Sequence, residues 1–195
     1  MPRFAHVPAR VRAAATFAAL LTACGGDGAT GPDAGAAGRF SGTVAGSVSR
    51  SITGVAYYAQ VSQDGEAGFG IGMGALAADQ KTFTDLVVIG RERTGMPAPG
   101  TYTLHNSASG TEPTADQFVL VSTLQLPNGG ELFCLATTGT VTLEGASGGR
   151  LEGSYSTQAS CLDLTNPDAE VSVTLAGSFE AVSSSRLPQA AGAAR

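Results

Sequence analysis

The feature that most constrains the fold is a two-residue period of apolar and polar side chains that begins near Phe40. In the clearest stretch, Val171, Val173, Leu175 and Phe179 alternate with serine, threonine and glutamate residues. A period of two places successive side chains on opposite faces of a strand, so that one face is buried and the other meets water. No apolar stripe of helical period with capping residues interrupts this pattern. The chain is therefore predicted to be all-β.

Short turns separate the alternating stretches and predict how they are arranged. Asp64-Gly65, Asn128-Gly129-Gly130 and Ser147-Gly148-Gly149 tolerate the backbone angles of tight hairpins, and strands joined so tightly are antiparallel neighbours. An up-and-down meander must hide its edges by closing into a barrel or by packing as two sheets, and the barrel is favoured over the sandwich. We expect about ten strands, at residues 39–48, 52–62, 67–76, 82–90, 100–105, 116–126, 131–138, 139–145, 149–159 and 170–182.

The glycine-rich stretch GFGIGMG, residues 68–74, matches a loose dinucleotide-binding pattern. That pattern binds phosphate only where it turns from a strand into a helix. Here it leads through the turn Asp79-Gln80-Lys81 into another apolar strand. We therefore interpret it as a strand with Phe69, Ile71 and Met73 on one face and glycines on the other, where another segment can approach closely.

The first residues predict export. Three arginines without an acid precede an apolar run from Ala13 to Leu21, which is typical of a secretory signal and too short to span a membrane. The run ends in Leu21-Thr22-Ala23-Cys24, which resembles the lipobox of bacterial lipoproteins. The resemblance implies that residues 1–23 are removed and that Cys24 is lipidated. The alternatives are an ordinary cleaved signal with a small-residue site and a cytosolic protein with a chance apolar start.

Composition divides the rest of the chain into three parts. Residues 24–38 are rich in glycine, aspartate and proline and form a flexible tether. Residues 183–195 hold one isolated leucine and are predicted to be a disordered tail. The part between them, residues 39–182, has the length of a single domain with its own core.

Charge limits the partners of this domain. Without the three early arginines, eight basic residues face sixteen acidic ones, so the mature chain carries 8 − 16 = −8. No basic patch can be assembled from one lysine and scattered arginines, and nucleic acid is excluded as an expected partner. The expected partners are the membrane, through the lipid, and a protein or a small apolar ligand.

Cys134 and Cys161 are the two cysteines besides Cys24, and an exported compartment favours a disulfide between them. With a strand at 139–145 between the two segments, the cysteines would lie too far apart to bridge the middle of the sheet. We therefore expect the bond to pin a loop, residues 162–169, over the sheet, and to stabilise the fold by about 3–4 kcal/mol.

No catalytic or cofactor-binding constellation is recognisable. His105 is the single histidine after the signal, and no nucleophile elbow accompanies it, so we interpret it as a surface loop residue. Glu92, Glu144 and Glu152 are scattered over strand ends and exposed faces, where carboxylates keep edges soluble. The acidic stretch with Asp163, Asn166, Asp168 and Glu170 is a weak calcium candidate, because its spacing departs from the EF-hand loop. No cofactor is expected.

Two places are apolar on both faces of a predicted strand. Tyr57 and Tyr58 must point one ring to each face, and residues 85–89 (DLVVI) have apolar side chains on both sides. A loop or a partner is expected to cover the outer side there.

Three segments carry a family resemblance. Residues 139–143 (GTVTL), 149–155 (GRLEGSY) and 171–179 (VSVTLAGSF) resemble the closing strands of uncharacterised all-β bacterial lipoproteins. The turn Pro99-Gly100-Thr101-Tyr102 is similar to one in the same proteins. The resemblance implies an anchored β domain without known catalytic residues. Gly25 follows the lipidated cysteine in place of the aspartate that resembles an inner-membrane retention signal, which predicts the outer membrane in a host that has one.

Together these features favour a lipid-anchored, non-enzymatic β domain with a binding or structural role at the cell envelope. A barrel that carries a small apolar ligand is the alternative from another class. A carboxylate-based hydrolase is a third.

Overall fold

The computed structural model describes residues 37–63, 66–78 and 83–184, and within them the chain forms nine strands and no helix. The strands are β1 (Arg39–Gly46), β2 (Arg50–Gln63), β3 (Glu66–Leu76), β4 (Phe83–Arg91), β5 (Gly100–Thr103), β6 (Val119–Gln125), β7 (Glu131–Ser147), β8 (Arg150–Asp163) and β9 (Asn166–Ser183).

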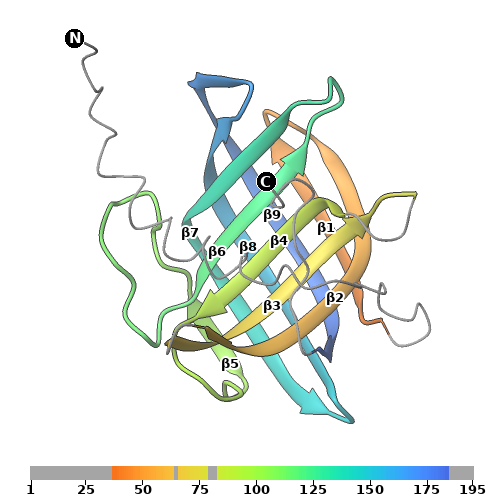
Figure 1. Cartoon of the computed structure of the whole chain (residues 1–195), viewed down its shortest axis with the longest axis vertical. Helices are drawn as coiled ribbons and strands as arrows, with labels where there is room; N and C mark the ends of the chain where they lie inside the picture. The colour runs from red at the N-terminus through yellow and green to blue at the C-terminus, as the bar shows by residue number, and fades with distance from the viewer. Residues whose placement is uncertain (1–36, 64–65, 79–82, 185–195) are drawn as a thin grey trace.

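Eight of these strands close into an antiparallel barrel, which confirms the favoured prediction. The sheet runs in the order β5-β7-β6-β4-β3-β2-β1-β9-β8, and β7 also pairs with β8, so the two ends of the sheet meet (Figure 1). β5 lies outside the closed ring and pairs with the second half of β7. The chain thus meanders around the barrel, with one excursion through β5 between β4 and β6.

The two strands predicted at 131–138 and 139–145 are one continuous strand, β7. Its register shifts between Ala136 and Thr138 and again between Leu143 and Gly145, which are β-bulges that bend the strand without ending it. Gly139 has a φ of 142°, and a Cβ atom there would lie 2.4 Å from the carbonyl oxygen of Ser156. This glycine allows a close approach of β8 and is not a turn. β7 therefore borders β6 with its first half and β5 with its second.

Side chains fill the barrel interior. Fully buried residues include Phe69, Ile71, Met73, Ile89, Phe118, Leu120, Leu124, Leu143 and Leu175, which belong to one continuous cluster contributed by the strands all around the ring. The alternating side chains predicted from the sequence thus point to a common apolar centre. Burial of this cluster is the main stabilising contribution to the fold.

The outer surface has two walls of different character. Over β8, β9 and β1 the outward residues are mostly serine, threonine and charged residues, as in the paired row Ser154, Ser178 and Ser41. We call this the polar wall. Over β2, β3, β4 and β6 the outward residues are Tyr57, Ala59, Gly70, Gly72, Leu86, Val88, Gly90, Val119 and Val121, which we call the apolar wall.

The glycine-rich stretch lies in β3 as predicted. Phe69, Ile71 and Met73 point into the core, and the glycines between them face outward. The ring of Phe83 lies over Gly74, where a Cβ atom would be 2.2 Å from its Cδ1 atom. The glycines therefore serve close packing on the outside of the barrel.

Gly54 lets β2 approach the backbone of β3 closely, and this generates a test of the packing between the two strands. A Cβ atom at Gly54 would lie 1.9 Å from the carbonyl oxygen of Gly74, so backbone would have to move to accept it. We expect Gly54→Ala to lower the free energy of unfolding by about 2–3 kcal/mol in a denaturant titration. Ser41→Ala, an exposed change on the adjacent strand, should stay within about 0.5 kcal/mol of the wild type. Equal stability of the two variants would contradict this account of the close approach at Gly54.

Candidate functional site

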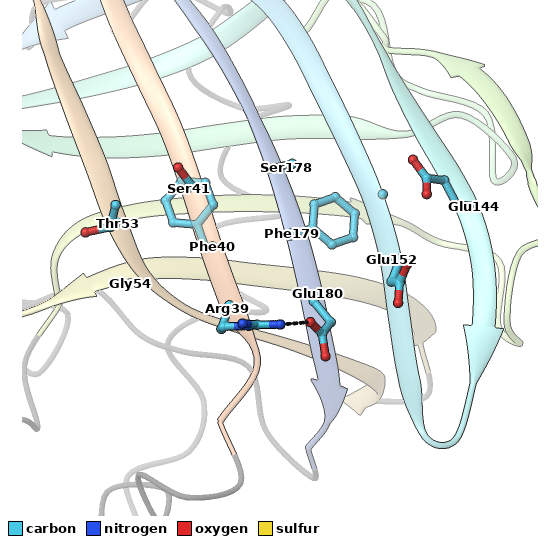
Figure 2. Close-up of a pocket in the computed structure, with 11 residues that line it drawn as sticks. Arg39, Phe40, Ser41, Thr53, Gly54, Glu144, Glu152, Ser178, Phe179 and Glu180 are labelled. Carbon is cyan, nitrogen blue, oxygen red and sulfur yellow. Dashed lines mark hydrogen bonds and ion pairs between the residues drawn. The ribbon is translucent and has the colours of Figure 1, made fainter.

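A hollow lined by polar groups lies on the outside of the barrel, over the polar wall. It has a volume of about 710 Å³ and extends over β2, β1, β9, β8 and β7. Figure 2 shows Glu180, Glu152 and Glu144 following one another on β9, β8 and β7, with Arg39 on β1 reaching toward Glu180. Its lining residues are Arg39, Phe40, Ser41, Thr53, Gly54, Glu144, Glu152, Gly153, Ser178, Phe179 and Glu180.

Register brings these residues together from distant parts of the chain. Arg39 pairs with Glu180 across β1 and β9, and Glu180 pairs with Glu152 across β9 and β8. Because the side chains alternate, all three point outward on one row of the polar wall. The next row holds Ser41 and Ser178, whose hydroxyl groups can both donate and accept hydrogen bonds.

Two arginines hold Glu180. The Nη2 atom of Arg39 donates to Oε2 of Glu180 at 2.6 Å, and Nη1 of Arg150 donates to Oε1 of the same carboxylate. These contacts favour the ionised form, so the hydrogen bond from Arg39 and then that from Arg150 hold the pKa of Glu180 below its ordinary value. The group is exposed, and water screens its interaction with both arginines.

Glu144 and Glu152 form no ion pair with any basic residue in the described ranges. They lie on neighbouring strands, with Glu152 opposite Gly145 in the register. Three carboxylates and one guanidinium thus line the hollow, and it is acidic even after Arg39 and Glu180 have neutralised each other. Such a surface offers hydrogen-bond acceptors to a polar or cationic ligand.

The disulfide between Cys134 and Cys161 is present, but the expected placement was wrong. The two residues lie directly opposite each other on neighbouring strands, β7 and β8, with 4.0 Å between their Cα atoms. The error came from dividing β7 in two, because that inserted a strand between the cysteines. Both side chains are fully buried and belong to the barrel core. The bond therefore lies across the seam that closes the barrel.

The loop expected at residues 162–169 is also absent. β8 and β9 are joined by a tight hairpin in which Asp163 pairs with Asn166. The backbone and hydroxyl groups of Thr165 donate to Oδ1 of Asp163, and these bonds lower the pKa of that carboxyl. The hydroxyl of Ser160 donates to Glu170. These two members of the calcium candidate thus have local partners, and the side chain of Asp168 lies outside the described part.

Within the described ranges, no group of three or more histidine, cysteine, aspartate or glutamate residues is arranged to hold a metal ion. In the same ranges, no helix is long and apolar enough to cross a membrane. Cys24 lies outside the described residues, as do residues 1–36 as a whole. The lipidation therefore stays a prediction.

His105 lies at the barrel end beside the loop that follows β5. Its side chain is buried, and Nε2 is 3.0 Å from the carbonyl oxygen of Thr111. The prediction of a surface position is therefore wrong, because the ring is buried. Among the described residues, no serine or carboxylate hydrogen-bonds to this ring.

One residue that the sequence analysis missed is Arg91. Its side chain is buried at the same barrel end, with the guanidinium carbon 5.4 Å from the ring centre of Phe118 and Nη2 donating to Gly95. An arginine at the end of an apolar strand gives no sequence signal of burial. The cation–π contact with Phe118 explains how the core accepts it.

No protein-family model, curated protein or solved structure matches this chain. The resemblance to all-β lipoproteins therefore stays a prediction, and function must be argued from the site.

The position of the disulfide in the core generates a stability test. Cys134 and Cys161 close a segment of 27 residues, so Cys134→Ala with Cys161→Ala should cost about 3–4 kcal/mol by the chain-entropy model. In a domain of this size the melting temperature should fall by about 10 °C. The serine pair should lose more, because each buried hydroxyl without a partner adds about 1–3 kcal/mol. Cys24→Ala is the control and should have the melting temperature of the wild type. An unchanged melting temperature for the alanine pair would contradict a stabilising disulfide between Cys134 and Cys161.

Proposed function

We propose that this protein is a lipid-anchored binding module of the cell envelope, without enzymatic activity, that contacts its ligand in the hollow on the polar wall. The proposal rests on one observation: the barrel interior is filled, and the open polar space lies on the outer surface. The interior is filled by a continuous apolar cluster that includes the disulfide. The open, polar space lies outside, over five strands.

The filled interior supports this proposal over a carrier function. A small apolar ligand inside the barrel would need space that Phe69, Phe118 and Leu120 occupy in the structure. Binding on an outer wall needs no such space, and the rigid core holds the wall residues in place.

The lining also gives less support to a hydrolase. Hydrolysis by two carboxylates requires them to flank the scissile bond across a cleft, with one group kept protonated. Glu180 is instead held ionised by Arg39 and Arg150. Glu144 and Glu152 lie side by side on neighbouring strands of one wall, not on two facing walls of a cleft.

The lining of the hollow indicates the class of ligand. Carboxylates of Glu144 and Glu152 lack ion-pair partners in the described part, and Ser41, Thr53 and Ser178 add hydroxyl groups to the lining of the same hollow. We therefore propose a polar ligand with amino or guanidinium groups, such as a basic peptide segment. Its binding should weaken with salt, because exposed charges are screened.

Attachment to the membrane is the first part of the proposal to test. In cells fed a clickable fatty acid, the wild-type protein should be labelled and should fractionate with membranes. Cys24→Ala should abolish labelling and leave the protein soluble, because no thiol remains at the lipobox to accept the lipid. Ser41→Ala is the matched control. A Cys24→Ala protein that is still labelled would contradict the anchor.

Ligand binding is the second part. A fluorescent hexalysine peptide serves as the probe, and its binding to the purified protein is followed by anisotropy. We expect Glu144→Gln with Glu152→Gln to weaken binding about tenfold or more, which corresponds to about 1.4 kcal/mol.

Glu112→Gln, an exposed change in the loop after β5, is the matched control and should leave the affinity unchanged. Equal weakening by both variants would show that net charge alone attracts the peptide and would contradict a site in the hollow. Turnover of the peptide by the wild type would indicate an enzyme.

A further inference from the structure

The apolar wall is buried although it lies on the outside of the barrel. Leu86 and Val88 are each 3% exposed, and Tyr57 is 5% exposed. None of the three belongs to the core cluster inside the ring. On β3, Gly72 lies between Tyr57 and Val88, and Gly70 lies between Ala59 and Gly90, so the outward side of β3 offers no side chains to cover its neighbours. On such a surface, side chains are expected to be well exposed to water.

The described strands and loops do not account for this burial. The loop between β4 and β6 is tied to β7 at the barrel end, where the backbone N–H of Ser107 donates to the carbonyl of Ala136 at 2.9 Å. Within the loop, the backbone N–H of Arg93 donates to the carbonyl of Ala115 at 2.9 Å. In Figure 1 this loop lies beside the barrel, away from the middle of β3 and β4. Phe83 covers Gly74, at the opposite end of the wall.

The C-terminal end of the described chain adjoins this wall. β9 passes the start of β1 and pairs in parallel with β2, where Tyr57 is opposite Val182 and Tyr58 is opposite Ser183. The backbone N–H of Ser184 then donates to the carbonyl of Tyr58 at 2.8 Å. The next residue of the chain, Ser185, thus follows directly from the edge of the apolar wall.

We propose that residues 185–195 dock on the apolar wall, with Leu187 over Gly72 of β3, between Tyr57 and Val88. Leu187 is three residues beyond Ser184, a reach of about 10 Å in an extended chain. The distance from β2 to β4 is two strand spacings, also about 10 Å. The bare glycines leave a shallow path into which an extended segment fits.

The composition of the segment suits this wall. Its sequence, SRLPQAAGAAR, holds one leucine, one proline and five small alanine or glycine residues, and no acid. Its two arginines carry charge opposite to that of the acidic domain, which attracts the segment to the barrel. Composition alone predicted a disordered tail; the burial of the wall beside its first residue is the reason to assign it a binding site.

The segment before β1 suits the apolar wall less well than residues 185–195 do. Gly38 also lies near the wall, with its carbonyl accepting from Ala56 at 3.2 Å. The segment before it, residues 25–36 (GGDGATGPDAGA), has alanine as its only apolar residue and adds two aspartates to an acidic domain. It has no side chain large enough to replace Leu187.

Cysteine accessibility tests the proposal in the intact protein. Val88→Cys places a thiol on the apolar wall, and Thr43→Cys places one on the exposed outer side of β1 as the control. The rate of labelling by a maleimide reagent is measured for both thiols. When the protein is made without its lipid, Cys24 is replaced by serine so that its thiol does not react.

We expect the thiol of the Val88→Cys variant to be protected from the reagent in the full chain. Deletion of residues 185–195, or Leu187→Asp, should accelerate its labelling roughly tenfold or more, because the rate follows the population of the open form. The thiol of the Thr43→Cys control should react at the same rate in every background.

Other outcomes overturn the proposal. Protection that survives tail deletion but is lost on deletion of residues 1–36 would assign the wall to the N-terminal segment. Protection that depends on protein concentration, and not on the tail, would assign it to a second copy of the chain. Val121→Cys provides a second reporter on the same wall if Val88→Cys does not fold.

Discussion

The pairing of β7 with β8 is the interaction on which the rest of the structure depends. Without it the sheet would have two open edges, whereas with it every strand of the ring is paired on both sides. The pair extends from Leu132 opposite Asp163 to Ser147 opposite Arg150. The disulfide lies within this seam, so the covalent bond and the hydrogen-bonded ladder secure the same closure. Closure in turn fixes the interior volume that the core side chains fill.

Much of the fold could be predicted because local signals and the final fold agree. The alternating residues from Val171 to Phe179 form the two faces of β9. Gly148 and Gly149 form the predicted turn between β7 and β8. The partner of Cys134 followed from the number of cysteines and the compartment. These inferences needed only the local backbone period or a count, so tertiary packing could not overturn them.

The errors arose where one residue type serves two purposes. Gly139 resembles a strand end in the sequence, yet it allows a bulge and a close approach to β8. The acidic residues after Cys161 resemble a loop, yet Asn166 already begins β9. The hollow could not be predicted at all, because Arg39 and Glu180 are 141 residues apart and meet only through the closed register. Arg91 was missed since its burial depends on the ring of Phe118.

Within single strands, the period of two also separates the side chains that pack in the core from those that face outward. On β7, Cys134 and Leu143 point into the core, while Glu144, one residue beyond Leu143, lines the hollow. On β8, Leu151 is buried and Glu152 faces outward. A change of one residue along the chain therefore passes from a side chain that packs in the core to one that lines the outer hollow. Because the core is packed independently of the outer walls, the polar wall can vary in sequence without loss of the fold.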